Sequence, residues 1–102
     1  MNPTLRETAD IEAMWDALAR GAVDTIGTDH CPVPRARKVA DVWEAAPGLP
    51  GMATTLALLI TEGHRRRGIP LTRIAAVTAL NPARPFRLVP RKGTLRPGAG
   101  AD

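Results

Sequence analysis

Asp29 and His30 are the residues whose type and position are best suited to chemistry. They come directly after a short β-type run, residues 23–28, and are followed by Cys31 and Pro32. A carboxylate at the end of a buried strand is held rigidly while neighbouring loops enclose a substrate, so it can bind a metal ion or act as a general base. The alternative is that Asp29 only stabilises the Asp-His-Cys-Pro turn.

A complete metal site is not visible around Asp29. His30 and Cys31 could join it as ligands, but side chains at consecutive positions point in different directions. No second ligand pattern such as Cys-x-x-Cys or His-x-His occurs in the chain. We therefore favour a hydrogen-bonding structural role for His30, and we expect a metal bound by Asp29 to need ligands from other sequence.

Three further segments have residue types that suit binding. Backbone N–H groups of the loop 47–51, just before a predicted helix, could bind an anion or a carbonyl oxygen, although a stiff turn would have the same sequence. We interpret His64 and the adjacent Arg65–Arg67 as a solvated helix end. The segment 91–93 could contact phosphate, but a β-turn explains it better.

The elements that position these residues follow from apolar periodicity and from helix and strand end signals. We predict a helix capped by Thr8 and ending at Gly21, with Ile11, Met14, Trp15 and Leu18 on its buried face. After this helix we predict a buried strand over 23–28. A long loop follows over 31–50, and it contains a helical turn within 35–45. The remaining elements are a helix over about 52–67 with Met52, Leu56, Leu59 and Ile60 on its apolar face, a helix capped by Thr72, a short helix over 82–87 capped by Asn81, and a strand and turn over 92–98.

The single buried strand has a physical consequence. A strand without neighbours cannot satisfy its backbone N–H and C=O groups. We therefore expect the chain to be part of something larger, and we expect it to be poorly stable by itself because its helices lack the sheet they should cover.

Composition narrows the class of protein. The 102 residues suffice for one small domain, and 44% hydrophobic with 24% charged residues indicates a globular chain. The net charge of +4 is spread out apart from Arg65–Arg67 and is not interleaved with aromatics, so we expect no nucleic-acid partner. With no membrane-length apolar run, no secretory signal and one cysteine, we expect a cytoplasmic protein without a membrane partner or an intrachain disulfide.

Several segments, taken together and in order, resemble the C-terminal part of the cyclic amidohydrolases, the family of dihydroorotase, allantoinase and hydantoinase. They are Asn2-Pro3-Thr4-Leu5-Arg6, Gly27-Thr28-Asp29-His30-Cys31-Pro32, Pro47-Gly48-Leu49-Pro50-Gly51, Asn81-Pro82-Ala83-Arg84, and Pro90-Arg91-Lys92-Gly93 continuing to Asp102. The order and spacing of these segments carry the resemblance, which covers essentially the whole chain.

The resemblance implies an α/β fold that is one piece of a TIM-type (β/α)₈ barrel. Residues 1–88 would be the end of the barrel domain, mostly helical with one buried strand, and residues 89–102 would begin a C-terminal β-sandwich, here truncated. A complete barrel needs about 250 residues, so we expect a C-terminal fragment or a truncated gene product that is inactive alone. The parent would be a homo-oligomer.

The resemblance also implies a mechanism. In the family, a hydroxide that bridges two metal ions, usually zinc, attacks a ring amide. The aspartate after the last barrel strand binds one of the metal ions and carries the proton. Asp29 matches that aspartate, as metal ligand and catalytic residue. Asn2 matches a position that contacts the substrate in the family. Gly48, Leu49 and Gly51 lie in the loop that matches the family segment whose backbone recognises the cyclic amide. The family's other metal ligands match nothing in this chain.

Two departures leave the substrate open. Val33 stands where dihydroorotases commonly have a histidine, and Pro47-Gly48 replaces an Asn-Gly that often precedes the Pro-Gly of the family loop. The ring could be that of a hydantoin, an allantoin, a dihydropyrimidine or a dihydroorotate. Because ligands are missing, a non-catalytic truncated subunit or interaction module is the alternative function. A basic nucleic-acid binder would rest only on the net charge and Arg65–Arg67.

Overall fold

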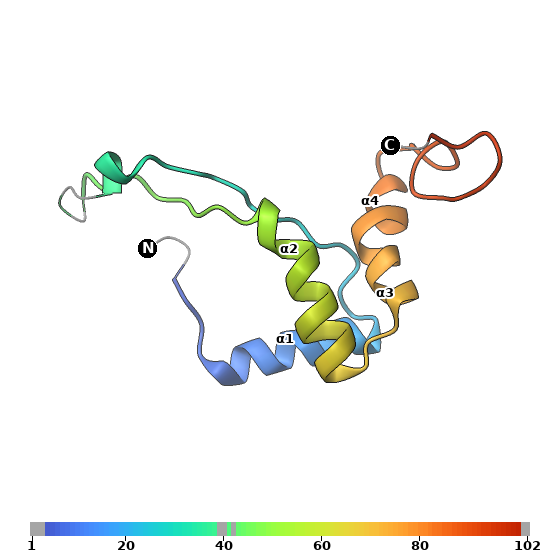
Figure 1. Ribbon diagram of the computed structural model, residues 1–102, viewed down its shortest axis with the longest axis horizontal. Coiled ribbons are helices and arrows are strands. Elements are labelled where there is room, and N and C mark those ends of the chain that lie inside the picture. The colour runs from blue at the N-terminus through green and yellow to red at the C-terminus, as the bar shows by residue number, and fades with distance from the viewer. Residues whose placement is uncertain (1–3, 39–40, 42, 101–102) are drawn as a thin grey trace.

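The computed structural model describes residues 4–38, 41 and 43–100 as helices joined by long loops (Figure 1). In chain order they are α1 (Thr8–Arg20), the 3₁₀-helix η1 (Arg35–Lys38), α2 (Met52–Leu58), the π-helix η2 (Leu59–Arg66), α3 (Leu71–Ala75), the π-helix η3 (Ala76–Leu80) and α4 (Asn81–Ala83). Asn2, a predicted substrate contact, lies outside the described residues. No described helix is long and apolar enough to cross a membrane.

The first predicted helix is confirmed, but its cap is not Thr8. Glu7 is the N-cap, in an extended conformation, and Thr8 is already helical. The first helical hydrogen bond runs from the N–H of Ile11 to the carbonyl of Glu7, which places the start one residue earlier than predicted. Gly21 ends the helix as expected, with a left-handed φ of 87° that suits glycine.

The second predicted helix is also confirmed, as α2 continued by η2. Gly68 ends it with a φ of 70°, and its N–H donates to the carbonyl of His64 at 2.9 Å. His64 is half-buried there, with Nδ1 2.9 Å from the carbonyl oxygen of Ile69. The interpretation of this helix end as solvated therefore holds for the exposed Arg65 and Arg66, whereas the partly buried ring of His64 takes part in closing the helix end.

One unbroken helical segment, α3–η3–α4, replaces the two short helices predicted after Gly68. Its N-cap is Pro70, so Thr72 lies inside the first turn and does not cap it. Asn81 has helical dihedral angles, φ −66° and ψ −44°, and is therefore not the N-cap of a new helix. Cap preferences are local, and packing in the folded chain overrides them at both positions.

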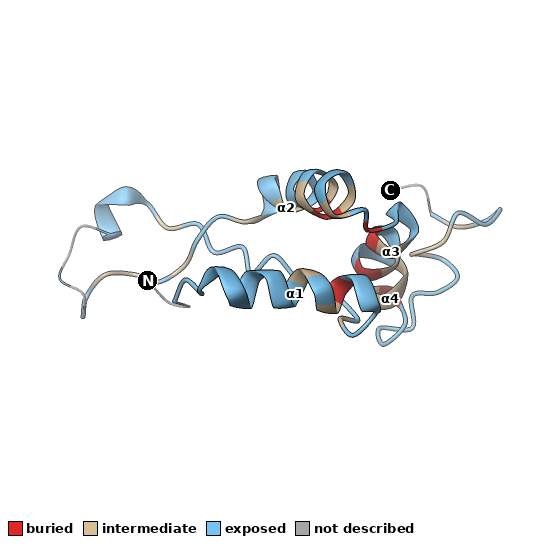
Figure 2. Cartoon of the chain, turned by 90° about the horizontal axis from the view of Figure 1, so that it is seen from below, coloured by how far each residue is buried: buried red, intermediate tan, exposed pale blue. Residues whose placement is uncertain are grey.

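The hydrophobic core lies where α1, η2 and α3–η3 meet (Figure 2). Its buried members are Leu18, Leu59, Ile69, Ile74 and Val77. The N-terminal part of α1 and the start of α2 lie outside this core, because Ile11, Met14, Met52 and Leu56 are exposed. Only part of the apolar face predicted for each helix is therefore buried within this chain.

The molecule is extended rather than compact. Its radius of gyration is 16.6 Å and its extents are 53 × 30 × 21 Å, whereas a compact domain of about 100 residues has a radius of about 13 Å. The accessible surface is 8119 Å², against about 5,600 Å² expected for a compact monomer of this mass. The excess of about 2,500 Å² and the exposed apolar faces indicate that these helices are shaped to pack against further protein.

The buried strand predicted over residues 23–28 does not form in this chain. The described residues contain no strand, and their one β-bridge is an isolated parallel contact between His30 and Leu49. Val23 and Ile26 are half-buried against the helices, whereas the residues between them are exposed. The reason is physical, since a strand needs a neighbouring strand for its ladder, and the described residues beside this segment are helical.

The C-terminal strand predicted within 92–98 is also absent. The described part of this segment closes on itself as a loop, with hydrogen bonds from Lys92 N–H to the Leu88 carbonyl and from Gly100 N–H to the Arg91 carbonyl. Gly93 lies so close to the preceding helix that a Cβ there would be 3.0 Å from the carbonyl oxygen of Ala79. A turn, rather than a paired strand, is what these residues build.

We expect the isolated chain 1–102 to unfold without a sharp cooperative thermal transition and to bind a hydrophobic dye. Among the described residues the core is small, with Leu18, Leu59, Ile69, Ile74 and Val77 buried, while large apolar side chains remain on the surface. Differential scanning calorimetry of the monomer, with dye fluorescence alongside, measures this. A sharp cooperative transition of a monomeric species would contradict the expectation.

Candidate functional site

Residues 23–28, the segment that leads to Asp29, are held at their start by Arg73. The Arg73 guanidinium donates from Nε to the carbonyl of Leu18 at 3.0 Å and from Nη2 to the carbonyl of Val23 at 2.5 Å. Arg73 therefore joins the end of α1 to the start of the segment. The sequence did not point to Arg73, because an arginine inside a helix has no local signal for partners 50 and 55 residues away.

Two more hydrogen bonds tie this segment to the last helix. The N–H of Ile26 donates to the carbonyl of Val77 at 3.1 Å, and the side-chain amide of Asn81 donates to the carbonyl of Asp24 at 2.9 Å. Asn81 thus binds the backbone of the segment instead of capping a helix. The backbone leading to Asp29 is consequently fixed from one side by helical residues.

Asp29 lies at the end of the fixed segment and is exposed. Its φ of 45° is left-handed, a conformation that aspartate tolerates better than most residues but that still carries strain. Its carboxylate has no hydrogen-bond or ion-pair partner among the described residues. The side chain is thus presented at a sharp turn and is not consumed in stabilising it, in contrast to the turn-stabilising alternative.

His30 caps the first turn of α2. Its Nδ1 accepts hydrogen bonds from the backbone N–H groups of Gly51 and Met52, both at 3.1 Å. This network assigns the ring proton to Nε2 in the neutral ring, so neither nitrogen offers a lone pair to a metal in this arrangement. The predicted structural role of His30 is confirmed.

The loop before α2 packs directly on the Asp29 turn. The N–H of Cys31 donates to the carbonyl of Leu49 at 3.0 Å. A Cβ at Gly48 would lie 2.5 Å from the carbonyl oxygen of Cys31, and a Cβ at Gly51 would lie 2.7 Å from that of Thr28. The structure therefore brings together the two predicted site segments, and only glycine permits the close approach at these two positions.

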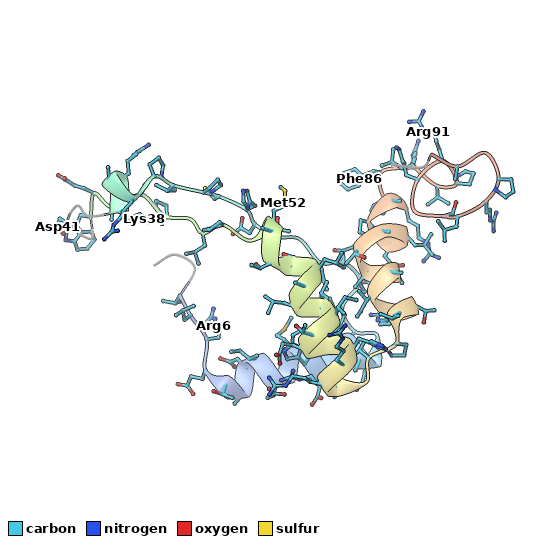
Figure 3. All side chains as sticks on the ribbon, in the orientation of Figure 1. Arg6, Lys38, Asp41, Met52, Phe86 and Arg91 are labelled. Atoms are coloured by element: carbon cyan, nitrogen blue, oxygen red, sulfur yellow. The ribbon has the colours of Figure 1, made fainter. Side chains whose placement is uncertain are left out.

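Several backbone groups of the loop already have partners. Besides the groups bonded to Cys31 and His30, the carbonyl of Gly48 accepts from Lys38 Nζ at 2.5 Å. Lys38 lies on the arm formed by the described parts of residues 31–50, far from the labelled Met52 at the start of α2 (Figure 3). For these groups of Gly48, Leu49 and Gly51 the stiff-turn interpretation describes the structure, and substrate contacts would have to use other groups of the loop.

The Arg65–Arg67 run is partly structural. Arg67 forms ion pairs with Glu12 and Glu62, and its guanidinium lies 5.0 Å from the centre of the Trp15 ring. Hydrogen bonds from the neighbouring arginines hold the pKa of Glu62 below its usual value. These contacts join α1 to η2, so Arg67 is engaged within the fold.

The described residues do not by themselves form a complete metal centre. No group of three or more His, Cys, Asp or Glu side chains that could hold a metal lies together in the part of the chain that the structure describes. The Asp29 carboxylate has no hydrogen-bond partner among the described residues, whereas His30 Nδ1 accepts hydrogen bonds from the start of α2. A metal bound here would depend on donors from other sequence.

Comparison with known families gives a decisive match. The model of the Amidohydrolase family matches residues 2–102. The chain belongs to the amidohydrolase family. This assignment confirms the family predicted from the ordered motifs around Asp29.

Two relatives of this amidohydrolase-family chain are a dihydroorotase and an allantoinase. It is 45% identical to the dihydroorotase of Halobacterium salinarum over 102 residues, which is 100% of this chain and 24% of that protein. It is 44% identical to the allantoinase of Deinococcus radiodurans over 101 residues, which is 98% of this chain and 22% of that protein. The chain therefore spans about a quarter of the length of these relatives.

A solved structure resembles the chain over its whole length. The D-hydantoinase (dihydropyrimidinase) of Thermus sp. superposes with a TM-score of 0.92 at 36% sequence identity, covering 100% of this chain and 23% of that protein. The helices and the extended arm of this chain thus have the arrangement of one segment within a larger hydantoinase structure.

Proposed function

We propose that residues 1–102 contribute the Asp29 region of the active site to a metal-dependent hydrolase that opens cyclic amides. The observation that carries this proposal is the match of the whole chain to proteins named dihydroorotase, allantoinase and hydantoinase. The unengaged Asp29 carboxylate, presented at the end of a fixed segment, supports its assignment as the residue that acts there.

In the proposed fold, residues 1–88 belong to the last part of a TIM-type barrel and residues 89–102 to the start of a β-sandwich. Residues 23–28 would pair with barrel strands supplied by other sequence, which would give their backbone groups the ladder they lack here. The exposed apolar faces of α1 and α2 would pack against the neighbouring parts of the barrel. Asp29 would then stand at the carboxyl end of a barrel strand, where barrel enzymes hold their catalytic groups.

The chemistry proposed for Asp29 is proton transfer. A bound divalent metal, which we expect to be zinc, would supply a water molecule of lowered pKa. The Asp29 carboxylate would accept the proton of the attacking water as the water oxygen bonds to the ring carbonyl carbon. The protonated carboxyl would then give the proton to the ring nitrogen as the C–N bond breaks, which returns the carboxylate to its starting form.

A non-catalytic subunit or interaction module is the second candidate function. It is favoured by the absence of a metal-holding cluster in the described residues. Metal analysis and an activity assay of the purified chain 1–102 test this second function. Stoichiometric zinc together with ring hydrolysis by the chain alone would refute the non-catalytic hypothesis.

The full gene product that contains this chain provides the test. We expect it to hydrolyse at least one of hydantoin, dihydrouracil, allantoin or dihydroorotate, to lose that activity on removal of metal by a chelator, and to regain it when zinc is added. Ring opening is followed by loss of ring absorbance or by chromatography. Absence of hydrolysis of all four rings by the folded, metal-loaded protein would refute the proposal.

A further inference from the structure

The carboxylate of Asp29 stands between two anchored stretches of backbone. On its N-terminal side, Asp24 and Ile26 are hydrogen-bonded to the helix that runs from α3 to α4. On its C-terminal side, His30 is bonded to the start of α2 through Nδ1. The left-handed φ of Asp29 is the sharp turn that joins these two stretches.

We propose that His30 is a positioning residue, whose Nδ1 cap on α2 fixes the backbone turn from which the Asp29 carboxylate projects. The inference rests on the proposed function of Asp29 and adds a residue to it. Two hydrogen bonds of 3.1 Å from Gly51 and Met52 hold the imidazole. The parallel bridge between His30 and Leu49 holds the adjoining backbone. Without the cap, the strained turn at Asp29 would be free to relax, and the backbone position that carries the carboxylate would no longer be fixed.

The atom that performs the role can be distinguished by substitution. The acceptor is Nδ1, the ring nitrogen nearer the backbone, and the Oδ1 of an asparagine occupies a similar place along the side chain. The Oε1 of a glutamine corresponds instead to Nε2. Asparagine at position 30 should therefore replace the cap, and glutamine should not. A role for Nε2 in binding metal or substrate predicts the opposite order.

The experiment compares His30→Ala, His30→Asn and His30→Gln in the full gene product loaded with zinc. We expect His30→Ala to lower kcat by about 10–100-fold and to weaken zinc retention against a competing chelator, the range typical of residues that orient a metal ligand. His30→Asn should recover most of both losses, and His30→Gln should remain close to His30→Ala. Thermal midpoints of the three variants show whether the order follows stability instead.

His64→Ala is the matched control, because His64 also contacts backbone through Nδ1 but lies at the far end of the same helix. We expect it to change the thermal midpoint while leaving kcat and zinc retention near wild type. Wild-type kcat and zinc retention in His30→Ala, or rescue by glutamine rather than asparagine, would overturn the inference. Wild-type activity of Asp29→Asn would instead overturn the proposed function, so the two failures can be told apart.

Discussion

Replacing Asp29 by asparagine in the full gene product should lower kcat/KM for ring opening by at least about 10³-fold, because one change removes two proposed roles. General acid–base groups typically contribute about 10²–10⁴-fold to a rate, and an amide can neither accept nor return the proton. An amide is also a weaker metal ligand than a carboxylate, so zinc content should fall as well. Steady-state kinetics at saturating zinc and elemental analysis measure the two effects separately.

Asp24→Asn is the matched control for this prediction. Asp24 lies on the same segment and is exposed, but its hydrogen bond to Asn81 uses its backbone carbonyl and not its carboxylate. We expect kcat/KM of Asp24→Asn within about twofold of wild type, as for an exposed substitution away from the site. An Asp29→Asn variant as active as Asp24→Asn would show that the carboxylate takes no part in the reaction.

Replacing Gly48 by alanine should have the largest effect on stability. The φ of Gly48 is 118°, which side chains rarely adopt, and its Cβ would lie 2.5 Å from the carbonyl oxygen of Cys31. Backbone atoms cannot move aside as a flexible side chain can, so the loop and the Asp29 turn would have to separate. We expect the free energy of unfolding of the full gene product to fall by about 2–4 kcal/mol, measured by denaturant titration.

Gly68→Ala separates conformational strain from steric overlap. Gly68 has a left-handed φ of 70°, but a Cβ there would meet nothing within 4 Å. We expect its substitution to cost about 1 kcal/mol, clearly less than that of Gly48. Equal losses for the two variants would mean that the contact between the loop and the Asp29 turn is not maintained in solution.

The helices were predictable from the sequence because their signals are local. Apolar spacing and the glycines Gly21 and Gly68 located α1 and the α2–η2 helix with small errors at the ends. The wrong caps at Thr72 and Asn81 have a common cause, since side-chain cap preferences are weak compared with packing. For Asn81 the competing interaction is visible, as its amide binds the carbonyl of Asp24.

The strand and the site could not be predicted in the same way. Residues 23–28 have the composition of a strand, but forming one requires a neighbouring strand, and the described residues provide none. The approach of Asp29 to the loop before α2 joins residues about 20 positions apart, and only the resemblance to a family pointed to it. The cap that His30 places on Gly51 and Met52 has no local sequence signal, because it depends on that same approach.

The most direct test of the central claim is to locate the metal by anomalous diffraction from crystals of the zinc-loaded full gene product. We predict a metal ion about 2.0–2.2 Å from a carboxylate oxygen of Asp29, with its other protein ligands outside residues 1–102. An active, metal-loaded enzyme in which the Asp29 carboxylate lies away from every metal ion would contradict the account.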